Sequence, residues 1–88
     1  MARTRVIVSG LVQGVFYRDA CQRGARAEGV AGWVRNRPDG TVEAVFEGGP
    51  DAVARMVAWA RTGPSRAIVS DITVIDEVPE GLAGFQVR

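Results

Sequence analysis

The sequence predicts one α+β domain, spanning residues 1–88, in which strands and helices follow in the order β-α-β-β-α-β. Short runs rich in valine and isoleucine are typical of strands. Two segments between them carry apolar residues at the i, i+3, i+4 and i+7 spacing of a helix face. Glycine and proline occur at the boundaries, where the chain must turn. A chain of 88 residues has room for one such domain with one core.

The first half of the chain contains a strand, a helix and a second strand. Residues 4–11 are apolar at nearly every position, which is typical of a strand in the interior of a sheet. Residues 17–28 change to the helical period, and Gly29 suits the left-handed position after a last helical turn. Residues 30–37 read as the second strand, with apolar members Ala31, Trp33 and Val34.

The second half begins with a turn at residues 38–40, Pro-Asp-Gly, which joins the second strand to an alternating strand over residues 41–47. A second helix starts at Pro50, since proline suits a first helical turn, and it stops before Gly63-Pro64. Residues 67–78 are rich in isoleucine and valine and predict a long strand. Residues 85–87 are a candidate for a last short strand.

Two βαβ units interlocked in this order make the ferredoxin-like split βαβ fold. Because crossovers between parallel strands are right-handed, both helices are expected on one face of a mixed, mostly antiparallel sheet. The expected strand order is 4-1-3-2.

The residue types present limit the available chemistry. The net charge is only +1, and all 11 basic residues are arginine, with no lysine and no histidine. This excludes a Schiff base, a P-loop lysine and any histidine base or metal ligand. The single cysteine, Cys21, excludes an internal disulfide. No apolar run approaches the roughly 20 residues of a membrane span, and no signal peptide precedes the first strand. We therefore expect a cytoplasmic protein, most simply a monomer.

The segment from Gln13 to Arg18 lies between the first strand and the first helix, where chemistry is expected. The first N–H groups of a helix lack intrahelical acceptors and carry partial positive charge. A loop made permissive by Gly14 can turn several N–H groups toward one anion, and an arginine fork matches phosphate geometry. Spacing alone leaves open a second interpretation, in which the glycine serves only the turn and Arg18 is merely solvated.

Two sequence blocks resolve this choice by resemblance. Residues 12–18, Val-Gln-Gly-Val-Phe-Tyr-Arg, resemble the signature of the acylphosphatase family. Residues 32–36, Gly-Trp-Val-Arg-Asn, followed by residues 39–43, Asp-Gly-Thr-Val-Glu, resemble its second block. The resemblance covers essentially the whole chain. It implies the same fold and hydrolysis of an acyl phosphate to a carboxylate and inorganic phosphate, without a metal ion or other cofactor.

The resemblance also implies roles for individual residues. Arg18 would bind the phosphate and Asn36 would position the attacking water. Where some relatives carry threonine after this asparagine, the chain has Arg37, so a hydroxyl role at that place is in doubt. The implied partners are a small acyl phosphate as substrate and inorganic phosphate as product and competitive inhibitor. The implied phosphate cradle is the backbone of Gln13, Gly14, Val15, Phe16, Tyr17 and Arg18.

These residue types suit an acyl phosphate, which already has a good carboxylate leaving group. Positioning and charge stabilisation can then lower the barrier without a strong acid. No side chain obviously serves as the base, so the substrate's own phosphate oxygen is the hypothesis.

Other features admit less specific interpretations. Cys21 lies on the apolar helix face and reads as a buried structural residue. Asp19 reads as a favourable charge in a first helical turn in preference to a partner of Arg18. RNA binding is disfavoured by the low net charge and by the lack of paired aromatics on the first and third strands. A regulatory module without turnover is the other alternative. The acidic residues near the last long strand read as solvated: Asp71, Asp76, Glu77 and Glu80.

Overall fold

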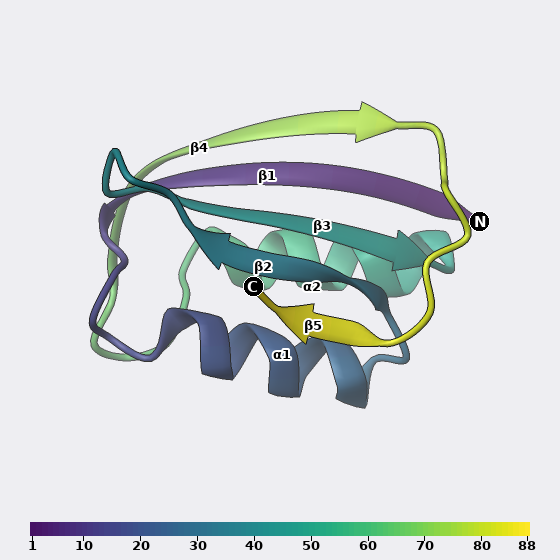
Figure 1. The fold of residues 1–88 in the computed structure, drawn as a ribbon, viewed down its shortest axis with the longest axis horizontal. Helices are drawn as coiled ribbons and strands as arrows, with labels where there is room; N and C mark the ends of the chain where they lie inside the picture. The colour runs from purple at the N-terminus through teal and green to yellow at the C-terminus, as the bar shows by residue number, and fades with distance from the viewer.

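The computed structural model describes residues 1–88 and has two layers, a twisted sheet and a pair of helices that cover one of its faces (Figure 1). Neither helix combines the length and apolar character needed to cross a membrane. The elements are β1 (Ala2–Leu11), α1 (Tyr17–Ala27), β2 (Ala31–Asn36), β3 (Val42–Gly48), α2 (Pro50–Ala60), β4 (Ile68–Glu77) and β5 (Phe85–Val87).

The strands lie in the order β4-β1-β3-β2-β5. This confirms the predicted order 4-1-3-2 and the interior position of β1. The candidate strand over residues 85–87 is present and extends the sheet beyond β2. It pairs with β2 in parallel, with Phe85 opposite Gly32, whereas the other three pairings are antiparallel. The end of β5 therefore lies beside the end of β2 (Figure 1).

The core lies between the helices and the sheet. Each helix contributes one buried stripe, which follows from apolar residues at helical spacing. Full burial of a side chain of this size contributes about 1.5–3 kcal/mol. The main contributors are Tyr17, Cys21 and Ala25 from α1, Val53, Met56 and Ala60 from α2, and Val6, Val8, Val34, Val42 and Phe46 from the sheet.

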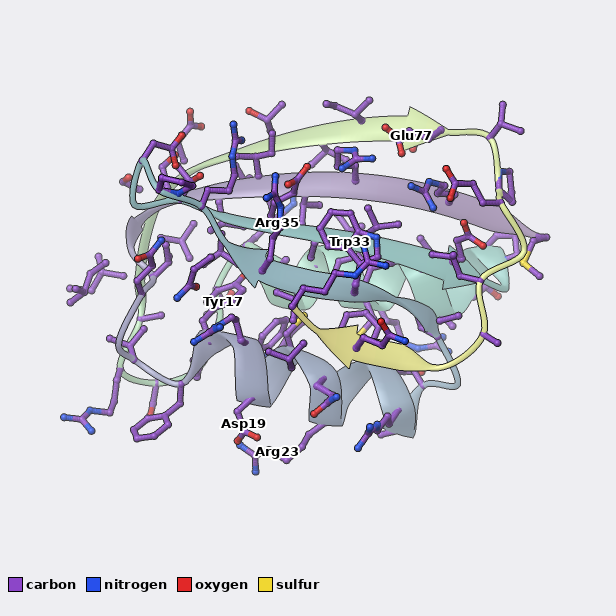
Figure 2. All side chains as sticks on the ribbon, viewed as in Figure 1. Tyr17, Asp19, Arg23, Trp33, Arg35 and Glu77 are labelled. Carbon is purple, nitrogen blue, oxygen red and sulfur yellow. The ribbon has the colours of Figure 1, made fainter.

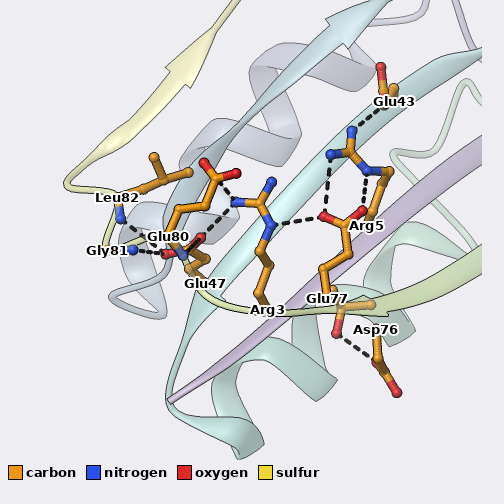
Figure 3. Close-up of polar contacts among 10 residues, drawn as sticks. Arg3, Arg5, Glu43, Glu47, Asp76, Glu77, Glu80, Gly81 and Leu82 are labelled. Atoms are coloured by element: carbon orange, nitrogen blue, oxygen red, sulfur yellow. Dashed lines mark hydrogen bonds and ion pairs between the residues drawn. The ribbon is translucent and has the colours of Figure 1, made fainter.

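The other face of the sheet carries a network of ion pairs (Figure 3). Arg3 on β1 lies opposite Glu47 on β3 and opposite Glu77 on β4. Its guanidinium donates to Glu47 at 2.6 Å and to Glu77 at 2.8 Å. Arg5 pairs in the same way with Glu77 and Glu43. The expectation that Glu77 is merely solvated is therefore wrong, because strand register brings two arginines against it.

Glu47 also holds the segment that connects β4 to β5. Its carboxylate, buried at 1% exposure, accepts the backbone N–H groups of Glu80, Gly81 and Leu82 (Figure 3). Burial would raise the pKa of Glu47, but the N–H groups of Glu80 and Leu82 and the Arg3 guanidinium outweigh it and lower the pKa to about 2. The network thus fixes the approach of β5 to the sheet.

Candidate active site

The loop between β1 and α1 has an unusual backbone. Gly14 has φ 74°, as its lack of a Cβ allows, and Phe16 has φ 64°. Phe16 is the one non-glycine residue with positive φ, a conformation that costs such a residue about 1–2 kcal/mol. Strain of this kind is concentrated at functional sites. The N–H groups of residues 13–16 have no acceptor within the protein, and no side chain caps α1. The loop therefore presents free donors.

Gln13 fixes this loop to the hairpin turn. Its side-chain Nε2 donates to the carbonyl oxygen of Arg37 at 2.8 Å and to that of Thr41 at 3.0 Å. Sequence reasoning assigned Gln13 to the cradle only through its backbone, so the positioning role of its amide is new. The β1–α1 loop and the end of β2 are consequently held together.

Tyr17 anchors the start of α1 to the end of α2. Its hydroxyl donates to the carbonyl of Ala60 at 2.7 Å, and its ring packs on Trp59 with centroids 5.1 Å apart. Burial raises the pKa of this phenol. Figure 2 shows Tyr17 at the start of α1. The side chain of Tyr17 therefore has a structural role.

A cavity of about 380 Å³ opens at this end of the sheet. Volumes of this order are typical of small-molecule sites. It brings together Arg18 and Asn36, the two residues singled out by sequence, with part of the predicted cradle. Val15 is buried and the Gln13 amide faces the turn, so neither lines the cavity. The lining residues are Val12, Gly14, Phe16, Tyr17, Arg18, Asp19, Asn36 and Val87.

Arg18 is half-buried and forms no ion pair with any carboxylate of the chain. Its neighbour Asp19 pairs instead with Arg23, at 3.1 Å, on the exposed side of α1 (Figure 2). This agrees with the interpretation of Asp19 as a first-turn charge. The Arg18 guanidinium is thus left free for an anion in the cavity.

Asn36 ends β2 and carries the one buried side-chain polar atom without a hydrogen-bond partner, its Oδ1. A buried acceptor that is left unpaired costs about 1–3 kcal/mol. The cavity is therefore lined by both an amide whose acceptor is uncommitted and an uncommitted guanidinium. An amide both donates and accepts, so it can orient a water molecule.

The other candidates contribute no groups to the cavity. Cys21 is fully buried in the core, and burial raises the pKa of its thiol, as expected for a structural residue. No three acidic, cysteine or histidine side chains gather into a metal-binding cluster. On the open sheet face Trp33 is 9% exposed and is flanked by three guanidiniums, 4.9–6.0 Å from its ring centroid. That face lacks the stacked aromatic platform of an RNA-binding sheet.

Known proteins resemble this chain along nearly its whole length. The acylphosphatase family model matches residues 4–87. An acylphosphatase of Gloeobacter violaceus is 55% identical over 97% of this chain and 91% of its own. The crystal structure of acylphosphatase from Bacillus subtilis superimposes with a TM-score of 0.96 at 38% identity, covering 100% of this chain and 99% of that one. The structure of an acylphosphatase from Coxiella burnetii superimposes with a TM-score of 0.94 at 37% identity, covering 99% of this chain and 92% of that one. The chain belongs to the acylphosphatase family.

Proposed function

We propose that this acylphosphatase hydrolyses its substrate by in-line attack of water on phosphorus, with the phosphoryl group held by Arg18 and the Gln13–Arg18 loop and the water oriented by Asn36. The observation that carries the proposal is the pairing of two uncommitted groups in one cavity. The Arg18 guanidinium has no carboxylate partner, and the Asn36 Oδ1 has no donor.

The loop supplies the charge stabilisation. In this proposal its free N–H groups, together with those of the first turn of α1, direct partial positive charge toward the phosphoryl group. Arg18 adds a planar fork with charge-assisted hydrogen bonds of about 1.5–3 kcal/mol each. Such preorganised donors act on the equatorial oxygens, where charge is spread in phosphoryl transfer. The strained Phe16 backbone is the cost of this arrangement.

Bond changes follow from the same geometry. The water oxygen forms a bond to phosphorus while the bond from phosphorus to the acyl oxygen breaks, and the carboxylate leaves with that electron pair. The water proton passes to a phosphoryl oxygen, so the substrate serves as its own base. Asp19, the one carboxylate at the cavity, is exposed and paired with Arg23. A pH–rate profile that required an enzyme carboxylate would contradict this assignment.

The proposal extends to partners and surroundings. The substrate is a small acyl phosphate, and inorganic phosphate is both product and competitive inhibitor. We expect the active form to be a monomer. The single free thiol fits a reducing compartment such as the cytoplasm. No cofactor or nucleic acid takes part.

The test is hydrolysis of benzoyl phosphate in the presence of EDTA. The wild-type protein is expected to turn it over, with competitive inhibition by inorganic phosphate. Arg18→Ala and Asn36→Ala should each lower kcat/KM by a hundredfold or more, on the order of the loss of one transition-state donor. Arg23→Ala is the matched control, because this arginine pairs with Asp19 on the outside of α1. Full activity in both cavity variants would overturn the mechanism.

A further inference from the structure

We infer that the Phe16 side chain is a specificity-determining contact for the acyl group of the substrate, and that the site favours acyl phosphates with a flat, apolar acyl group. The inference rests on the proposed in-line mechanism. That mechanism explains what the backbone of residue 16 does, but it leaves the ring without a role.

The in-line geometry of the reaction determines on which side of phosphorus the acyl group leaves. In an in-line displacement the attacking and leaving oxygens lie on opposite sides of phosphorus. Asn36, at the end of β2, lines the cavity, and in the proposed mechanism the water that it orients attacks from its side of phosphorus. The acyl group then departs on the side of phosphorus away from Asn36. Four apolar residues line the cavity, namely Val12, Phe16, Tyr17 and Val87, and Phe16 is the most exposed of them.

Phe16 has the properties of a ligand contact rather than of a core residue. Its side chain is 63% exposed, although it lines the cavity and is followed directly by the buried Tyr17. A large exposed aromatic that lines a cavity offers an apolar surface to the apolar part of a ligand. The left-handed backbone at this residue, φ 64° and ψ 24°, holds the ring outside the core.

Arg66 restrains the ring at this place. Its guanidinium carbon lies 5.9 Å from the Phe16 ring centroid, and it forms no ion pair with a carboxylate. A cation over an aromatic face is attracted by the negative potential of the ring. This weak attraction between two exposed side chains favours the observed position of the ring. An acyl group with a flat π-face can stack on it, whereas an acetyl group offers little area to contact.

The experiment compares kcat/KM for benzoyl phosphate and acetyl phosphate in the wild-type protein, Phe16→Asn and Phe16→Tyr. Asparagine tolerates the left-handed backbone but lacks the ring. Tyrosine retains the ring. The ratio of benzoyl to acetyl kcat/KM is expected to fall about three- to tenfold in Phe16→Asn, the size of a lost aromatic contact. In Phe16→Tyr the ratio should stay within about twofold of wild type.

An unchanged ratio in Phe16→Asn would overturn the inference, even if both substrates lost activity equally, because an equal loss reports a damaged loop. A wild-type protein that hydrolyses neither substrate would overturn the proposed function instead. Circular dichroism and the inhibition constant for inorganic phosphate show whether the Phe16→Asn variant is folded with its cradle intact. If that variant is unfolded, Phe16→Leu is measured in its place and the same two results for the ratio decide.

Discussion

At the scale of single residues, the polar groups around the cavity divide into those that are already hydrogen-bonded and those that are not. Gln13 donates through its side-chain amide to carbonyl groups of the hairpin turn, and Tyr17 donates through its hydroxyl to a carbonyl group of α2. Arg18 and the Asn36 Oδ1 are not engaged. This division separates groups that position the site from groups that are available to act on substrate.

The positioning role of Gln13 predicts a specific loss. Gln13→Ala removes the two hydrogen bonds that tie the loop to the turn, so the free N–H groups are held less firmly toward one anion. Inhibition by inorganic phosphate should weaken about fivefold to tenfold, and the free energy of unfolding should fall by about 1–3 kcal/mol. Steady-state inhibition and urea denaturation measure the two effects. Gln22→Ala is the control, because the Gln22 amide donates to the carbonyl of Phe85, which lies away from the loop.

At the scale of elements, the site depends on how the two helices meet. The start of α1 is fixed by Tyr17, whose ring packs against the turn that follows α2. Gly63 lies in that turn with φ 69°, and a Cβ built on it would lie 2.7 Å from Cε2 of Tyr17. Glycine is therefore required at this position for two reasons: its backbone has positive φ, and a Cβ would clash with the Tyr17 ring.

Gly63→Ala tests this contact, with Gly29→Ala as a matched control. Both glycines have φ 69°, but a Cβ at Gly29 has no atom within 4 Å. Both variants should lose stability from the backbone conformation, by about 1 kcal/mol. Gly63→Ala should lose about 1–3 kcal/mol more, since the clash forces the Tyr17 ring to move. Equal unfolding midpoints and slopes for the two variants in urea would show that the contact with Tyr17 is unimportant.

At the scale of the whole molecule, the two faces of the sheet hold the fold in different ways. The helix-covered face is apolar, and the open face is laced by carboxylate–arginine pairs. The Arg5 and Arg3 guanidiniums lower the pKa of Glu77 to about 2, and the pKa of Glu47 is also lowered to about 2. A carboxylate with a lowered pKa stabilises the fold when it is ionised.

This predicts a loss of stability in acid. For Glu47 the folded-state pKa, about 2, lies below its ordinary value of 4.5, so its contribution is complete above pH 4.5 and is lost as pH falls toward 2. Glu47→Gln should flatten the decline in unfolding free energy over that window, measured by urea denaturation at each pH. Glu80→Gln is the control, because the Glu80 side chain is largely exposed. An equally steep decline in Glu47→Gln would contradict the assignment.

Much of this fold could be predicted because its signals are local. Helical spacing and the Pro50 start gave both helices, and alternation gave the hairpin. The pairing of Arg3 with Glu47 and Glu77 could not be predicted in this way, because it depends on strand register, which joins residues 44 and 74 positions apart. Because of this register, the Glu77 carboxylate, which was expected to be solvated, pairs with Arg3 and Arg5.

The site divides in the same manner. Arg18 and Asn36 were identified from two sequence blocks, and the structure brings them to one cavity. The left-handed Phe16 had no sequence signal, since phenylalanine does not favour positive φ. The Gln13 bonds to Arg37 and Thr41 depend on the distance between a loop and a turn, which only the folded chain defines.

The central claim is that water attacks phosphorus, with Asn36 holding the water and Arg18 the phosphoryl group. The direct measurement is hydrolysis of benzoyl phosphate in water enriched in a heavy oxygen isotope, with mass spectrometry of both products and subtraction of an enzyme-free reaction. The account predicts one heavy oxygen in inorganic phosphate and none in benzoate. Heavy oxygen in benzoate would show attack at the acyl carbon and would contradict the account.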